Sequence, residues 1–218
     1  MNGLAPQTSA IFEAVSTLEC IKPYVLVGGT ALSLQLGTRQ SEDLDFMSWR
    51  KTKNEKREVN WPEIKKELEN IGTVNKTDIF DLDHIEFIVN GVKISFYASP
   101  NSSPLSHEIH LLNNIRLADP LSIGAMKMEV MLRRSNFRDY YDIYSLLEAG
   151  IDLKKMIDLA LKYSGHRLKS KNLIALLTRS DRFIKDSTFN MLSPIYDITP
   201  KEIEARIIAE LSHCQYTF

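Results

Sequence analysis

Hydrophobic residues follow two different spacings over the first 118 positions. Some segments repeat every three to four residues, as an amphipathic helix does, and others are short apolar or alternating runs rich in β-branched and aromatic side chains. The spacings predict helices over residues 9–18 and 61–70, and strands over residues 73–79, 84–89 and 92–98. Asn90 and Gly91 separate the last two strands, a pair typical of a tight hairpin. The pattern indicates an α+β fold with a mixed β-sheet and helices packed against it.

The pattern becomes helical from residue 119 onward. Asp119 and Pro120 are typical of a helix start, and Leu121, Met128 and Leu132 are expected to form the buried stripe of that helix. Asn136 is a suitable cap for the next helix. Further helices are predicted over residues 153–163, 168–179 and 201–212. We therefore predict two domains, residues 1–118 with the sheet and residues 119–218 as an α-helical C-terminal region.

Residues 24–48 combine a strand, a glycine turn, a short helix, a polar loop and a second strand. The first strand, residues 24–27, is followed by Gly28 and Gly29, and residues 30–36 have room for about two helical turns. The second strand begins around Asp43 and Asp45. Side chains alternate along a strand, so these two carboxylates share one face about 6.5 Å apart at the backbone.

Two such carboxylates suit a hard divalent cation, because Mg²⁺ binds oxygen ligands and shares them between carboxylates and substrate phosphates. Backbone N–H groups at the start of a helix suit a triphosphate, and glycine lets the phosphate approach closely. Arg39 and Ser41, in the loop before the aspartates, are placed to add contacts to the same phosphates. A plain turn and a solvated edge strand would give the same pattern without a ligand.

The string GGTALSLQLGTRQSEDLDF resembles the first motif of the nucleotidyltransferases of the DNA polymerase β superfamily. Its GGTAL start and R-x-S-x-DLDF end resemble more narrowly the AbiEii/AbiGii-type nucleotidyltransferase toxins. A later K-x-E and an RDYYDIYxL string are similar to further motifs of that family. The resemblance implies a polymerase β-like core, an NTP substrate, Mg²⁺ or Mn²⁺ as cofactor, and an antitoxin partner.

The resemblance also assigns roles to individual residues. Asp43 and Asp45 would bind the metal, and the phosphates would be held by Gly28, Gly29, Thr30, Arg39 and Ser41. Lys127 would hold the triphosphate or the charge that develops on it, and Asp139 or Asp142 would orient Lys127 or the attacking hydroxyl. Structural roles are the alternative for both acids, since Asp139 suits the first turn of a helix and Asp142 could pair with Arg138. The helical region would thereby contribute to the active-site cleft.

The sequence departs from the superfamily pattern on the strand of residues 92–98. A third carboxylate is expected there, and Ser95 occupies its position. Glu86 on the neighbouring strand is a weak candidate to replace it. Lys93 faces either the nucleotide or the solvent.

Composition limits the remaining possibilities. Hydrophobic residues make up 44% and charged residues 25%, and the net charge of −1 argues against broad electrostatic adhesion to nucleic acid. Basic runs at residues 50–57 and 165–171 fit a phosphate backbone or a solvated loop. Cys20 and Cys214 are too few for a disulfide framework, the histidines show no metal-ligand spacing, and no run is long enough to span a membrane, so a cytoplasmic location is expected.

These observations predict a metal-dependent nucleotidyltransferase that moves NMP from an NTP to an acceptor hydroxyl. RNA, including tRNA ends, is the favoured acceptor because of the family resemblance, which also predicts the toxin of a toxin–antitoxin or phage-defence system. Two alternatives stay open. One is transfer to a small hydroxyl compound, and the other is a degenerate module that binds nucleotide or RNA without turnover, which the missing third carboxylate favours.

Overall fold

The structure is a computed structural model that describes residues 2–50, 52, 57–165, 167–185 and 187–213. The chain forms two compact units, Met1–Asp119 and Pro120–Phe218. Parts of the two predicted basic runs and Cys214 lie outside the described residues. No helix in the described residues is both long enough and apolar enough to cross a membrane.

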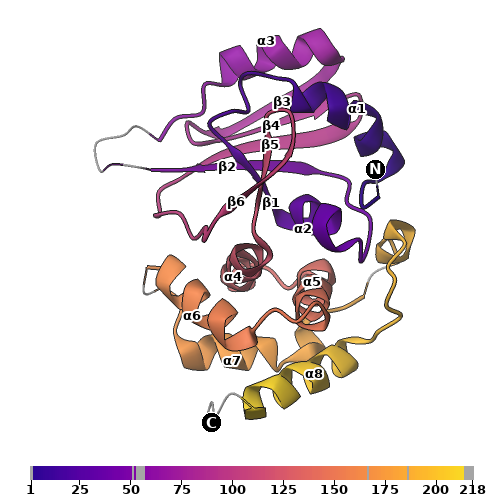
Figure 1. Cartoon of the computed structure of the whole chain (residues 1–218), viewed down its shortest axis with the longest axis vertical. Helices are drawn as coiled ribbons and strands as arrows, with labels where there is room; N and C mark the ends of the chain where they lie inside the picture. Colours follow the sequence, from indigo (N-terminus) through magenta and orange to yellow (C-terminus); the bar gives the residue numbers. More distant parts are fainter. Residues whose placement is uncertain (1, 51, 53–56, 166, 186, 214–218) are drawn as a thin grey trace. The chain divides into compact units, whose positions relative to one another are not determined.

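The first unit contains a mixed sheet, which confirms the predicted fold class (Figure 1). Its described strands are β1 (Val25–Val27), β2 (Leu44–Trp49), β3 (Val74–Asp81), β4 (His84–Val89), β5 (Val92–Ser99), β6 (Glu108–Leu112) and β7 (Ile115–Ala118). They run in the order β3-β4-β5-β2-β1-β7-β6. β2 lies parallel to β5 and antiparallel to β1, and β1 lies parallel to β7. β2, which carries the predicted carboxylates, is therefore an internal strand.

Helices α1 (Pro6–Ser16) and α3 (Trp61–Ile71) contact each other and bury their apolar sides in the core of this unit. Phe46 and Phe96, from the parallel pair β2 and β5, stack with ring centroids 5.3 Å apart and form the centre of that core. Because Phe46 and Phe96 point into the core, the alternate residues of β2 and β5 point to the other face of the sheet.

The β4–β5 hairpin forms as predicted, since Asn90 and Gly91 have φ values of 49° and 82°, the positive angles that a tight hairpin turn requires. A second hairpin, β6–β7, was not predicted. Its turn includes Asn113 with φ of 47°, but β6 lies at the sheet edge and is mostly exposed, so it lacks the apolar alternation that signals a strand.

The second unit is helical, as predicted (Figure 1). Its α-helices in the described residues are α4 (Pro120–Val130), α5 (Phe137–Glu148), α6 (Leu153–Tyr163), α7 (Ser170–Leu177) and α8 (Pro200–His213). Two short 3₁₀ turns, Ser180–Arg182 and Phe189–Leu192, lie between α7 and α8. Asn136 caps α5 as predicted, because its side chain accepts a 2.9 Å hydrogen bond from the backbone N–H of Arg138.

The predicted buried stripe of α4 is wrong in part. Met128 is fully buried, but the helix ends at Val130, and Leu132 beyond it is 37% exposed. The helix is buried on nearly all sides between Ser122 and Glu129, so burial does not follow a single stripe. Gly124 makes this packing possible, since an added Cβ would lie 2.4 Å from the Sδ atom of Met156 on α6.

Candidate active site

Asp43 and Asp45 lie at the start of β2, beside two polar residues of β5. Asp45 is the register partner of Ser95, whose hydroxyl donates a 2.6 Å hydrogen bond to Asp45 Oδ1. Lys93, two residues earlier on β5, places its Nζ 3.3 Å from Asp43 Oδ2. The parallel pairing of β2 and β5 thus sets a lysine beside one carboxylate and a serine beside the other. Of the two alternatives for Lys93, the structure favours the one in which it faces the site.

The electrostatics of this pair favour a bound cation. Burial raises the pKa of Asp43; the Lys93 ammonium lowers it by less, and the Asp45 carboxylate raises it further. For Lys93, burial lowers the pKa, but Asp43, Asp45 and Glu86 together raise it above its usual value. One ammonium therefore leaves the Asp43 carboxylate incompletely stabilised, and a divalent cation beside it would supply further positive charge.

The glycine pair lies beside Asp45, one of the two predicted metal ligands. β1 ends at Val27, which is the register partner of Asp45, and α2 (Gly28–Leu36) begins at the next residue. The helix therefore starts two residues earlier than predicted, with Gly28 at φ of 69° in its first turn. A Cβ on Gly28 would lie 3.1 Å from Asp45 Oδ2. No side chain caps this end of α2, so its first N–H groups are suited to donate hydrogen bonds to a phosphate.

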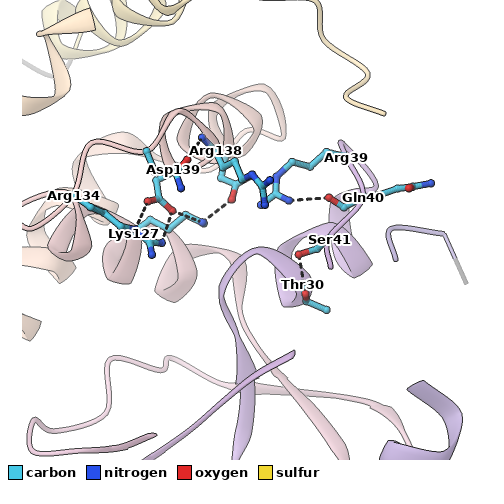
Figure 2. A network of polar contacts seen from close by, with 10 residues as sticks. Thr30, Arg39, Gln40, Ser41, Lys127, Arg134, Arg138 and Asp139 are labelled. Carbon is cyan, nitrogen blue, oxygen red and sulfur yellow. Dashed lines mark hydrogen bonds and ion pairs between the residues drawn. The ribbon is translucent and has the colours of Figure 1, made fainter. Parts of the chain in front are cut away.

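Arg39 and Ser41 approach the second glycine of the pair. A Cβ on Gly29 would lie 2.4 Å from an Nη atom of Arg39 and 3.2 Å from the Ser41 hydroxyl. Arg39 is buried, and it donates a 2.8 Å hydrogen bond to the carbonyl of Gln40 (Figure 2). The structure thus brings a guanidinium and a hydroxyl to the start of α2, as the sequence predicted for a phosphate site.

Thr30 ties the loop to the helix. Its buried hydroxyl lies 2.8 Å from that of Ser41 (Figure 2). The same hydroxyl donates a hydrogen bond to the carbonyl of Asp43. Both contacts hold the loop between α2 and β2, which ends at Asp43, in place. A direct contact between Thr30 and the phosphates stays a prediction, whereas its positioning role is visible in the structure.

Replacing Gly29 with alanine is expected to weaken NTP binding by about tenfold, because the new methyl group displaces Arg39 and removes a charge-assisted contact. Isothermal titration calorimetry with NTP would measure the loss. Gly37→Ala is the control at the other end of the same helix, because nothing lies within 4 Å of an added Cβ there, although its φ of 63° adds backbone strain that Gly29→Ala does not have. Equal NTP affinity in wild type and Gly29→Ala would argue against phosphate binding by Arg39.

A second charged cluster lies within the helical unit. Lys127 on α4 places its Nζ 2.9 Å from Asp139 Oδ1 and 2.6 Å from Asp142 Oδ2, both on α5 (Figure 2 shows Lys127 and Asp139). Arg134 adds a bond from Nε to Asp139 Oδ2 of 2.9 Å. The side chains of Lys127 and both aspartates are almost completely buried. Both predicted acids therefore contact the predicted lysine, where the sequence left open which one does.

Asp139 is strongly acidic in this cluster. Burial raises its pKa, but Lys127 and Arg134 outweigh that effect and lower the pKa to about 2. Asp139 is therefore charged at neutral pH and holds the ammonium of Lys127 in one position. Sequence reasoning missed the part played by Arg134, since its position shortly before α5 gave no sign of a contact with Asp139.

The third carboxylate is missing from the structure as it is from the sequence. Within the described residues, no three His, Cys, Asp or Glu side chains are grouped so that they could hold a metal ion. Glu86 is the register partner of Ser95 on β4, and its carboxylate lies 3.5 Å from His84 Nε2. The donor set that fits a hard cation therefore consists of two carboxylates, with a hydroxyl in the third position.

A cavity of about 400 Å³ lies elsewhere in the first unit. It is lined by the last residues of β2 and β5, among them Trp49 and Ser99, and by Tyr24 and Arg57. None of the predicted site residues lines it. The carboxylate pair instead lies where β2 begins, half exposed on the face of the sheet opposite the aromatic core.

The fold is similar to solved nucleotidyltransferase structures. MenT4, a nucleotidyltransferase toxin of Mycobacterium tuberculosis H37Rv, matches with a TM-score of 0.58 and 18% identity, over 90% of this chain and 77% of that one. A protein of H. pylori solved as a candidate nucleotidyltransferase matches with a TM-score of 0.58 and 20% identity, over 98% of this chain and 100% of that one. At these identities the likeness shows the fold, and the fold is that of a nucleotidyltransferase.

The chain belongs to the AbiEii family, described as the nucleotidyl transferase AbiEii toxin of a type IV toxin–antitoxin system, whose model matches residues 11–204. It is also 27% identical to an uncharacterized protein of Aquifex aeolicus (strain VF5) over 165 residues, which are 74% of this chain and 76% of the relative. The match confirms the family that the sequence motifs indicated. The protein is a nucleotidyltransferase of a toxin family, which implies an NTP substrate and an antitoxin partner.

Proposed function

We propose that this protein uses a divalent cation, Mg²⁺ or Mn²⁺, to transfer NMP from an NTP to a hydroxyl group of RNA, with tRNA ends as the first choice. The observation that carries the proposal is the position of Asp43 and Asp45 beside the uncapped start of α2. Two carboxylates and a set of backbone N–H groups are complementary to a metal-bound triphosphate. NTP and RNA meet in the cytoplasm, where we propose that the protein acts.

The residues of the first unit divide the work between phosphate and metal. Gly28 and Gly29 let the triphosphate approach the N–H groups of α2, and Arg39 with Ser41 adds positive charge and a hydroxyl donor. Asp43 and Asp45 would hold the cation, which supplies neutralisation of the charge on the reacting phosphates. The acceptor hydroxyl gives up its proton to solvent and its oxygen forms a bond to the α-phosphorus, while the bond from that phosphorus to pyrophosphate breaks. Positioning of the reactants and neutralisation of the phosphate charge would supply most of the rate enhancement.

Lys127 is proposed to bind the triphosphate or the charge that develops on it. What supports this role is the way the second unit holds its ammonium between two buried carboxylates, Asp139 and Asp142. Such a group is charged and fixed before the substrate arrives, so little reorganisation is needed during the reaction. The two acids are positioning residues in this proposal.

Label transfer from each of the four α-³²P-labelled NTPs tests the proposal. Each NTP is incubated with protein and total RNA, with Mg²⁺, with Mn²⁺, or with excess chelator. We expect label in RNA from one or a few NTPs and none with chelator. If label is transferred to small hydroxyl compounds and not to RNA, the acceptor is a small molecule and the RNA part of the proposal is wrong. NTP binding without any transfer would favour the degenerate binding module, for which Ser95 in the third carboxylate position is the supporting observation.

A further inference from the structure

Three aromatic side chains form a continuous row across β3, β4 and β5, which we call the aromatic row: Phe80, His84 and Tyr97. Phe80 stacks on His84 with ring centroids 4.8 Å apart and an angle of 26° between the planes. His84 meets Tyr97 edge to face at 5.6 Å. Tyr97 and His84 are register partners, so the row crosses the sheet from one strand to the next (Figure 1 labels the three strands).

The aromatic row is open to solvent. Phe80 is 61% exposed, and the His84 side chain is 37% exposed. The pairing of β3 with β4 shifts register between Ile79 and Asp81, and such a bulge changes the direction of a side chain. The sheet therefore holds a phenylalanine ring against His84 at an exposed edge, where a large apolar side chain gains little from burial.

The aromatic row lies on the same face as the carboxylate pair. Asp45 pairs with Ser95, and Tyr97 is two residues further along β5. The side chains of Asp45, Ser95 and Tyr97 therefore point to the same side of the sheet. Two residues along a strand correspond to about 6.5 Å. An acceptor whose hydroxyl reaches Asp45 would therefore have its neighbouring groups within reach of the aromatic row.

Charge on this face does not oppose a nucleic acid as strongly as its acids suggest. Asp43 is paired with Lys93, and Asp78 is paired with Lys76 at 2.7 Å. With these two carboxylates paired to lysines, planar bases can approach the rings with less repulsion of the phosphates that accompany them.

We propose that the aromatic row binds the bases of single-stranded RNA by stacking. Aromatic side chains on a sheet surface stack unpaired bases, and each base contributes through the face of its ring, so little sequence preference is needed. The inference rests on the proposed function for the choice of RNA as acceptor. It deepens that function, because the row holds the strand next to the carboxylates independently of the NTP.

Fluorescence anisotropy with a labelled single-stranded hexaribonucleotide tests the aromatic row, without NTP or metal. Phe80→Leu keeps an apolar side chain but removes the planar ring, and we expect about tenfold weaker binding. Phe80→Trp retains wild-type affinity because it keeps a stacking face. Leu82→Ala is the matched control, since Leu82 is 63% exposed at the same edge but offers no ring, and its affinity should stay within about twofold of wild type.

Three results would overturn the inference. The first is equal affinity in wild type and Phe80→Leu. The second is an equally large loss in Leu82→Ala, which would show that apolar surface and not ring stacking carries the binding. The third is a wild type that does not bind the oligonucleotide at all. Asp45→Asn separates this test from the proposed function. If Asp45→Asn binds RNA like wild type but transfers no label, both proposals stand. If the wild type shows Phe80-dependent RNA binding but transfers no label, only the proposed function fails.

Discussion

Replacing Asp45 with asparagine is expected to lower the rate of nucleotide transfer by about 10³-fold, equivalent to about 4 kcal/mol in the barrier. Asparagine has nearly the same shape, and its amide oxygen can still accept the hydrogen bond that Ser95 donates to Asp45. The local fold should therefore persist. The negative charge is lost, however, and with it half of the carboxylate pair that we propose as the cation site.

Two measurements check this expectation. Initial rates of label transfer at saturating NTP report the loss of activity, and electron paramagnetic resonance of Mn²⁺ reports the loss of cation binding directly. Asp78→Asn is the matched control, because Asp78 lies on the same sheet, pairs with Lys76, and belongs neither to the carboxylate pair nor to the aromatic row. A variant at Asp45 that keeps more than about a tenth of the wild-type rate would contradict a catalytic cation at this position.

Local spacing made much of the fold predictable. The alternation that places Asp43 and Asp45 on one face is a property of any strand, and the Asn90-Gly91 turn has a backbone requirement that few residue pairs meet. By contrast, the β6–β7 hairpin lies at an exposed edge, where burial imposes no pattern on the sequence. The buried stripe of α4 was predicted wrongly in part for a related reason, because a helix buried on nearly all sides gives no periodic signal.

Contacts between distant strands account for what the sequence did not reveal about the candidate site. Lys93 and Ser95 have the same two-residue spacing as the two aspartates, which is the one sign that they share a face. Their actual partners follow from the parallel pairing of β2 with β5, which is about 50 residues away in the chain and is set by the whole sheet. The same holds for the aromatic row, whose members come from three strands and carry no motif of their own.

Replacing Lys127 with methionine is expected to lower the free energy of unfolding by about 3–5 kcal/mol, because it leaves Asp139 and Asp142 buried without their shared ammonium. Chemical denaturation would measure the change. Lys154→Met is the matched control, since Lys154 pairs with Asp158 on the surface of the same unit and its loss should cost no more than about 1 kcal/mol. A double variant, Lys127→Met with Asp142→Asn, should recover part of the loss by removing one uncompensated charge.

The pH dependence separates this charge effect from a simple packing defect. In wild type, the pKa of Asp139 is lowered to about 2 in the folded protein, whereas its usual pKa is about 3.9. Its contribution to stability is therefore complete above the usual pKa and is lost as the pH falls toward 2. Without Lys127, only Arg134 opposes the burial that raises the pKa of Asp139, so that pKa rises and protonation at acid pH relieves the variant. The difference in unfolding free energy between wild type and Lys127→Met should therefore be largest near pH 7 and shrink at pH 4. A difference that stays constant between these pH values would show that Lys127 contributes through packing and not through its charge.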